Sequence, residues 1–146
     1  MNNPQIETIV DGLEPIALIL KADFEASGVH FFTPDNFSQQ LAYMSHPKDK
    51  IISPHTHNLV SRQVLYTQEV LIVRKGSIEV SLYTSKRVFL TSRVLGPGDL
   101  ILLCGGGHSF RMLEDTSMIE IKQGPYPGEN DKTRFEPQGG IHDTSK

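Results

Sequence analysis

The apolar residues of this chain occur in short runs separated by polar and turn-forming residues. Residues 77–83 alternate between polar and apolar, which is typical of a strand with one buried face. The continuous apolar run at 100–104 predicts a strand buried on both faces. Further strands are predicted at 16–20, 29–32, 41–44, 51–53, 64–66, 69–74, 88–90, 94–95, 108–113 and 118–122. Only residues 35–40 favour a helix, of a single turn, so the pattern predicts an all-β fold.

Turn signals divide these strands at regular intervals. The sequence Gly-Pro-Gly-Asp at 96–99 is a strong turn, because proline fixes φ and glycine tolerates positive φ. The polar turn at 114–116 is expected to join 108–113 and 118–122 as a hairpin. Many short strands with regular turns predict a sandwich or a barrel. We expect one domain over 1–146, with a barrel core at about 50–123, an N-terminal strand extension at 1–49 and a polar tail at 124–146.

Composition argues against several classes of function. The chain has 146 residues and a formal net charge of -3 without a basic run, so we expect no nucleic-acid partner. The first residues lack the pattern of a signal peptide, and no apolar stretch is long enough to span a bilayer. Cys104 is the only cysteine, which excludes an intrachain disulfide and gives no sign of an oxidising compartment. These features predict a cytoplasmic protein that does not act at a membrane.

Three histidines and one glutamate carry the strongest chemical signal. His55 and His57 are two residues apart, so in a strand both side chains would project from the same face. Glu69 opens an apolar strand, and His108 follows a later turn and a short apolar strand. Imidazole and carboxylate groups are common ligands of divalent metals. We therefore predict that these four side chains converge on one metal ion.

This order of residues resembles that of the cupin superfamily, whose fold is the double-stranded β-helix or jelly roll. The first cupin motif is a His-x-His pair, a Glu, and a Gly after six intervening residues, as at His55, His57, Glu69 and Gly76. The second motif resembles segment 98–110, in which Gly-Asp precedes an apolar strand, a glycine loop, a histidine and an aromatic residue. The similarity covers about residues 50–123 and implies a cupin fold with a metal held by the four predicted ligands.

Two features depart from the family pattern. The family usually has about three or four residues between the second His and the Glu, whereas eleven separate His57 from Glu69. Strict spacing would place the Glu position on Arg62, which cannot ligate a metal, so we interpret the intervening segment as an inserted loop. The loop at 104–108 is one residue shorter than the usual Pro-x-Gly-x-x-His loop and lacks the proline, and Met112 stands where the motif often has Asn.

Strand alternation indicates which side chains would line a substrate pocket. If His108 points inward, Phe110 and Met112 do as well. Thr67 and Gln63 share the parity of the predicted glutamate ligand. These four residues are the predicted substrate contacts. The pocket around the metal would then be mostly apolar, which is a common form for small-molecule sites.

Three functions are compatible with these residues. The first is a metal-dependent enzyme, an oxygenase or an isomerase/epimerase, that uses Fe, Mn, Ni, Co or Zn on a small oxygen-rich or sugar-like metabolite. The second is a non-catalytic binding or sensing module with the metal as ligand anchor. The third is a metal-free cupin similar to sugar-nucleotide isomerases, with His55 or His57 as general base. Segments 66–71 and 122–126 also resemble small bacterial cupins associated with surface-polysaccharide and nucleotide-sugar genes. By analogy of fold, we expect a small-molecule ligand and a homodimer.

Overall fold

The computed structural model of the chain describes residues 6–137, and this range is all-β. Its strands are β1 (Glu7–Asp11), β2 (Glu14–Leu20), β3 (Gly28–Phe31), β4 (Ala42–Ser45), β5 (Glu69–Lys75), β6 (Ile78–Tyr83), β7 (Phe89–Leu95), β8 (Leu100–Leu103), β9 (Gly107–Met112) and β10 (Ser117–Lys122). Within this range the only helical segment is a short 3-10 turn, η1 (Gly128–Asp131), and no helix there has the length and apolarity of a membrane span. The end of the predicted polar tail, including His142, lies outside the described residues.

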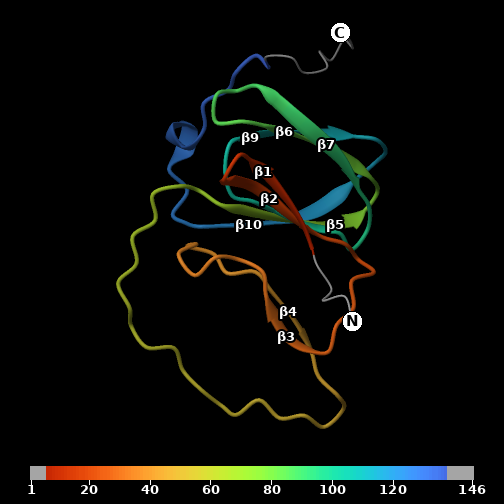
Figure 1. The fold of residues 1–146 in the computed structure, drawn as a ribbon, viewed down its shortest axis with the longest axis vertical. Coiled ribbons are helices and arrows are strands. Elements are labelled where there is room, and N and C mark those ends of the chain that lie inside the picture. The colour runs from red at the N-terminus through yellow and green to blue at the C-terminus, as the bar shows by residue number, and fades with distance from the viewer. Residues whose placement is uncertain (1–5, 138–146) are drawn as a thin grey trace.

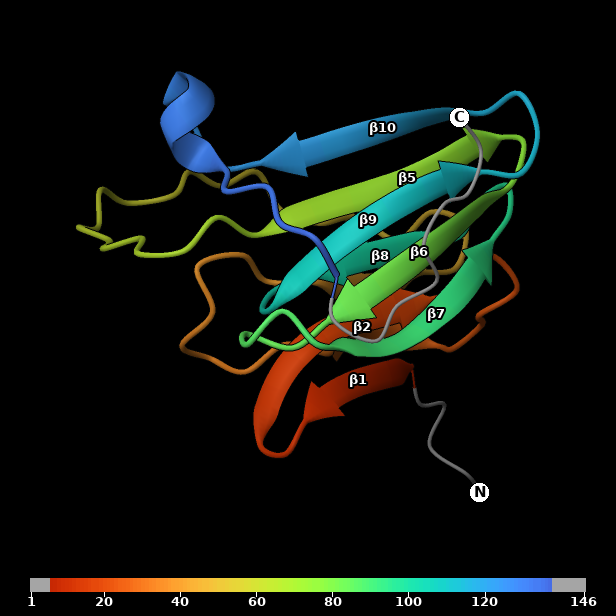
Figure 2. The ribbon, with the colours of Figure 1, turned by 90° about the horizontal axis from the view of Figure 1, so that it is seen from above.

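The strands form three antiparallel sheets, and none of them closes on itself within residues 6–137. A five-stranded sheet has the order β1-β2-β8-β5-β10, a three-stranded sheet has the order β7-β6-β9, and β3 and β4 form a separate hairpin. Figure 1 shows the five-stranded sheet between the three-stranded sheet and the β3–β4 hairpin, and Figure 2 shows the two larger sheets from above. The predicted all-β class is therefore confirmed.

The hydrophobic core lies between the five-stranded and three-stranded sheets. Ile78, Val80 and Leu82 point inward from β6 and are fully buried, while the polar residues between them are half-buried. Leu71 on β5 and Ile101 on β8 meet them from the opposite sheet. The alternation at 77–83 thus corresponds to a strand with one buried face, as predicted.

Strand β8 is buried on both faces, as its continuous apolar sequence predicts. Leu102 on β8 pairs with Leu18 on β2, and both are buried although neither belongs to the core cluster between the sheets. Beyond the last β2–β8 pair, the chain after β2 is fastened to the turn before β8. Lys21 Nζ and the Ala22 N–H both donate hydrogen bonds to the Asp99 carboxylate. The beginning of the segment that leads to the β3–β4 hairpin is thereby held beside the turn before β8.

The predicted hairpin between 108–113 and 118–122 is wrong. Strand β9 pairs with β6 in the three-stranded sheet, whereas β10 pairs with β5 in the five-stranded sheet. The turn at 114–116 therefore crosses from one sheet to the other. Core burial explains this crossing, because Phe110 on β9 and Met118 on β10 both pack against the core, from opposite sides. Thr116 Oγ1 also accepts a hydrogen bond from the Ser77 N–H at 3.1 Å, which holds the crossing turn against the β5–β6 connection.

Other strand boundaries also differ from the prediction. The segments 88–90 and 94–95 belong to a single strand, β7, because the polar residues between them continue the pairing with β6. The predicted helical turn at 35–40 is a series of bends and turns, so no helix forms there. Strand β1 is absent from the prediction because it contributes only one buried side chain, Ile9, and has a weak apolar pattern.

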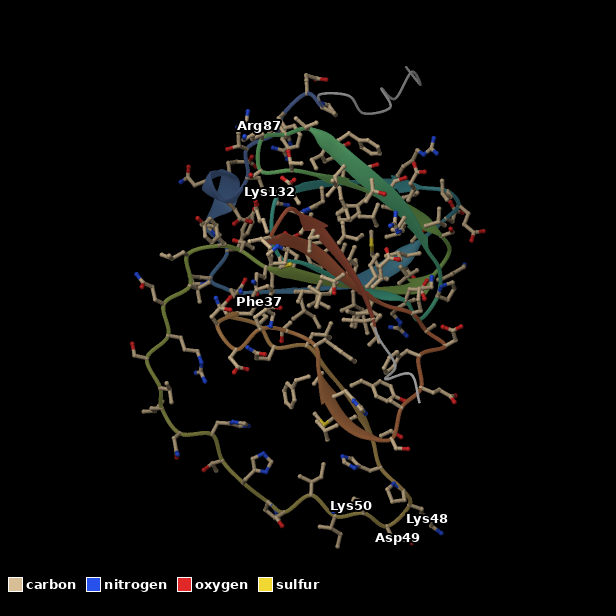
Figure 3. The ribbon with its side chains drawn as sticks, viewed as in Figure 1. Phe37, Lys48, Asp49, Lys50, Arg87 and Lys132 are labelled. Atoms are coloured by element: carbon tan, nitrogen blue, oxygen red, sulfur yellow. The ribbon has the colours of Figure 1, made fainter. Side chains whose placement is uncertain are left out.

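Residues 46–67, which we call the arm, connect β4 to β5 without forming any strand or helix. Every residue of the arm is exposed. Figure 1 shows the arm as a wide loop that lies apart from the sheets, and Figure 3 places Lys48, Asp49 and Lys50 at the end of the molecule opposite Arg87. The large apolar side chains exposed along the arm are Ile51, Ile52, Leu59, Val60, Val64, Leu65 and Tyr66. The strands predicted at 51–53 and 64–66 do not form, because a strand requires a neighbouring strand to satisfy its backbone groups.

Candidate functional site

Glu69 is a buried carboxylate at the beginning of β5. Its side chain points toward the interior with Leu71 and Val73, as strand alternation predicts, and the residue is only 6% exposed. In the five-stranded sheet it lies between Leu103 of β8 and Lys122 of β10. A buried carboxylate requires hydrogen bonds or a nearby cation, so its surroundings determine what it can do.

His108 supplies the main partner of this carboxylate. Its Nε2 lies 3.2 Å from Glu69 Oε2, and its ring is 5.3 Å from the ring of Phe110. Because β5 and β9 belong to different sheets, the Glu69–His108 pair joins the two layers at the edge of the core. The imidazole is partly open to solvent while the carboxylate is not. The structure therefore brings together two of the four predicted ligands.

The pair favours an ionised glutamate. The hydrogen bond from His108 is the largest influence and lowers the pKa of Glu69 below its ordinary value of 4.5. Burial acts in the opposite direction, and the charges of His108 and Lys122 lower the pKa further. Glu69 is consequently an anion at neutral pH, which is the form needed either to ligate a cation or to orient an imidazole.

Lys122 adds a second cation on the other side of Glu69. Its Nζ lies 3.7 Å from Glu69 Oε1, and 3.7 Å from carboxylate oxygens of Glu120 and Asp131. Partial burial lowers the pKa of Lys122, but these three carboxylates outweigh that effect and raise the pKa overall. The ammonium group also lies 5.2 Å from the centre of the Tyr126 ring. Lys122 thus remains charged and links the end of β10 to the η1 segment.

His55 and His57 lie on the arm. Their rings are 5.3 Å apart and edge-to-face, and His55 Nδ1 lies 2.9 Å from the Ser53 carbonyl oxygen. The prediction that they project from one face of a strand is wrong for this structure, because no strand forms here. The two histidines remain adjacent to each other, but the arm that carries them is exposed throughout.

Imidazole and carboxylate groups are suitable ligands for a divalent metal, but in this structure the four predicted ligands form two separate pairs. Glu69 and His108 form one pair, and His55 and His57 form the other. Among residues 6–137, no group of three or more His, Cys, Asp or Glu side chains lies close enough to hold a metal ion. A complete four-ligand site therefore requires the arm to approach a Glu69–His108 pair.

The predicted pocket residues divide between the body and the arm. Phe110 is partly buried beside His108, whereas Met112 at the end of β9 is 46% exposed. Gln63 and Thr67 are exposed on the arm, and the Thr67 hydroxyl donates to Asp131 Oδ1 at 2.9 Å. Of the four predicted contacts, Phe110 has its ring beside the His108 imidazole.

The glutamines that connect the end of the arm to residues 38–39 and Gln123 were not predicted from the sequence. Gln68 is 7% exposed, and its Oε1 accepts a hydrogen bond from the Gln39 N–H at 3.2 Å. Its own N–H donates to Gln123 Oε1 at 2.8 Å, and Gln123 Nε2 donates to Ser38 Oγ at 2.7 Å. These hydrogen bonds connect residues that are far apart in sequence. The one available signal was that Gln68 directly precedes Glu69 and Gln123 directly follows Lys122. The hydrogen bonds hold the end of the arm beside Glu69.

Cys104 is a structural residue by its environment. Its thiol donates to the Pro15 carbonyl oxygen at 3.5 Å, and burial raises the pKa of the thiol to about 11. A thiol with so high a pKa is a poor nucleophile at neutral pH. This geometry makes Cys104 a small packing residue at the end of an apolar strand.

Comparison of the chain with models of known protein families, with curated proteins and with solved structures gives no match.

Proposed function

We propose that this chain is a metal-binding jelly-roll protein of the cupin type. In this proposal a divalent cation (Fe, Mn, Ni, Co or Zn) is bound by Glu69 and His108 together with His55 and His57. Its activity is that of an oxygenase or an isomerase/epimerase on a small oxygen-rich or sugar-like metabolite. The observation that carries the proposal is the contact between an ionised, buried carboxylate and an imidazole across the two sheets.

The topology supports this proposal. Glu69 begins a strand of one sheet and His108 lies on a strand of the other, so their side chains meet between the two sheets at the edge of the core, where the imidazole is partly open to solvent. Gly76, which follows Glu69 after six intervening residues, has a φ of +89°, so the turn at this position requires glycine, as the first cupin motif does. The Glu–Gly part of the motif therefore coincides with a buried carboxylate and a turn that requires glycine.

The chemistry of the residues supports it as well. A bound divalent metal would polarise a substrate carbonyl and acidify a hydroxyl or water. The Glu69 carboxylate and the His108 imidazole would hold such an ion from the inner side, while Phe110 and Leu71 keep the surroundings apolar. Lys122 lies next to the same carboxylate and would attract an anionic group of the metabolite.

A metal-free acid–base function is the second candidate. Glu69 is already satisfied by His108 on one oxygen and by Lys122 on the other, which is the arrangement that orients a histidine for proton transfer. In this version His108 is the general base, in place of the histidines on the arm. Substrate would approach the imidazole from its solvent-exposed side.

Metal analysis of protein purified without chelators or a metal-affinity tag separates the two candidates. The metal proposal predicts a stoichiometric ion that is lost in Glu69→Gln and in His108→Ala, and retained in His46→Ala, a matched exposed histidine at the start of the arm. Protein that stays metal-free, with no gain in melting temperature on adding Fe(II), Mn(II), Ni(II), Co(II) or Zn(II), would refute it and favour the acid–base function.

Turnover distinguishes an enzyme from a binding module. We expect product formation or oxygen uptake with members of a panel of sugar nucleotides and keto acids, and loss of that activity in His108→Ala. Tight binding of a panel member without any turnover would instead assign a sensing role.

A further inference from the structure

The arm is a long exposed segment with several apolar side chains, and in the part of the chain that the structure describes its residues 46–66 contact no other element through hydrogen bonds. It carries seven of the large exposed hydrophobic residues, and all of its residues are exposed. The hydrogen bonds found within residues 46–66 are local, such as the contact between the His55 ring and the Ser53 carbonyl. An exposed apolar segment of this kind normally marks a surface that is covered in the assembled protein.

The body offers a complementary open edge next to His108. Strand β9 pairs with β6 on one side, and no strand within residues 6–137 pairs with its other side. An unpaired strand edge presents free N–H and C=O groups to an incoming strand. Side chains of a strand added there would lie about 5 Å from those of β9. A strand that carries His55 and His57 on the same face as His108 would place one imidazole opposite His108 and the other on its diagonal, about 7–8 Å away, within reach of long side chains.

We propose that two copies of this chain exchange arms, so that the arm of each pairs with β9 of the other. His55 and His57 of the partner subunit then join Glu69 and His108 to complete the metal site. This inference rests on the proposed function and identifies the source of its missing ligands. It also gives the predicted homodimer a chemical role, because each site is incomplete without the second copy.

A second copy of this chain is the partner that fits best, because each chain carries both an exposed arm and an unpaired β9 edge. A two-fold arrangement places both arms on both β9 edges at once and leaves neither exposed. At one end the arm leads into Gln68, whose hydrogen bonds tie it to Gln39 and Gln123, and at the other end it begins after Ser45, the last residue of β4. His55 and His57 lie near the middle, with a reach of roughly 35 Å from either end. That reach is larger than the roughly 15 Å radius of gyration expected for a domain of this length.

Cross-linking tests the exchange without depending on metal. Thr56 would project to the side opposite the two histidines, and Ser109 to the side opposite His108, so both would lie on one outer face. In a Cys104→Ala background, we expect Thr56→Cys/Ser109→Cys to give a covalent dimer on a denaturing gel after treatment with a short bis-maleimide. The matched control is Leu13→Cys/Ser109→Cys, since Leu13 is fully exposed but lies outside the arm. Cross-linking confined to single chains, or equal dimer formation in the control, overturns the proposal.

The mass in solution provides a second test. We expect a dimer for the natural chain and a monomer for Leu59→Ser/Leu65→Ser, because both leucines are highly exposed apolar residues of the arm. Leu13→Ser, with the same exposure outside the arm, should remain a dimer. A monomeric natural chain refutes arm exchange.

Dimers that combine two different variants distinguish arm exchange from the metal-binding function on which it rests. His55→Ala/His57→Ala protein lacks arm ligands, and Glu69→Gln/His108→Ala protein lacks body ligands, so each alone should bind no Mn(II) or Zn(II). Co-expressed and co-purified, they should bind about one ion per mixed dimer, because one of its two sites is intact. Metal in the natural dimer but none in the mixed dimer refutes exchange and leaves the proposed function standing. Cross-linked dimers of a natural chain that binds no metal support exchange and refute the metal site.

Discussion

Replacing Glu69 by glutamine tests whether the buried carboxylate stabilises the fold through its charge. Glutamine keeps the shape of the side chain but removes the anion that faces His108 and Lys122. The loss of a charge-assisted hydrogen bond costs about 1.5–3 kcal/mol, and the lower cost of burying a neutral amide offsets part of it. We expect a net loss of about 2 kcal/mol at pH 7, and a melting temperature lower by about 8 °C.

The pH dependence provides the sharper measurement. The pKa of Glu69 in the folded protein is below its ordinary value of 4.5, mainly because of the hydrogen bond from His108. The corresponding stabilisation is therefore fully present above about pH 4.5 and is lost as the pH falls through the folded pKa. The difference between the natural chain and Glu69→Gln should shrink over that interval and nearly vanish below it.

Denaturant unfolding at a series of pH values measures this difference directly. Glu79→Gln is the matched control, because Glu79 forms an ion pair with Arg111 at 3.2 Å but is more exposed. We expect the control to lose less than about 1 kcal/mol, without the same pH profile. A Glu69→Gln protein that is as stable as the natural chain at pH 7, or a difference independent of pH, would refute this account of the pair.

Three further substitutions and reactions test other parts of the structure. Gly76→Ala should lower the free energy of unfolding by more than about 3 kcal/mol, since φ is +89° and the new Cβ would overlap the Asp115 carbonyl. Gly12→Ala is the control: Gly12 has open space around it, and the substitution should cost about 1 kcal/mol. Asp99→Ala should lower stability by about 2–4 kcal/mol, measured by denaturant titration, because it removes acceptors of two backbone N–H groups and a lysine. Cys104, with a thiol pKa of about 11, should react with iodoacetamide at pH 8 far more slowly in folded protein than after unfolding. Equal rates in both states would contradict its burial.

The buried strands could be predicted from local sequence because burial of one or both faces of a strand produces a regular pattern of apolar residues. The alternation at 77–83 and the apolar run at 100–104 correspond to β6 and β8. Their pairing partners could not be predicted, because strand order depends on which faces meet across the core. The turn at 114–116 shows this, since its sequence favours a hairpin but its two strands complete different sheets.

The candidate site was predictable to the extent that it lies on strands with strong patterns. Glu69 and His108 occupy such strands, and their contact follows from inward alternation on both. His55 and His57 lie in a segment with strand-like composition, but a strand forms only beside another strand, so its state depends on a partner that the local sequence does not specify. The role of Gln68 could not be predicted, because its hydrogen-bond partners, residues 38–39 and 123, are distant from it in the sequence.

The position of β2 in the five-stranded sheet has a consequence for how the protein is made. Its Ala17 pairs with Leu103 of β8, so the inner part of this sheet is incomplete until β8 has left the ribosome. The arm emerges during that interval, before the body can close. Sheets with such distant pairings form slowly, and their unfinished forms expose apolar surface. We therefore expect nascent chains on one messenger to meet with their arms uncovered, which favours assembly during translation and makes chaperone supply a determinant of yield.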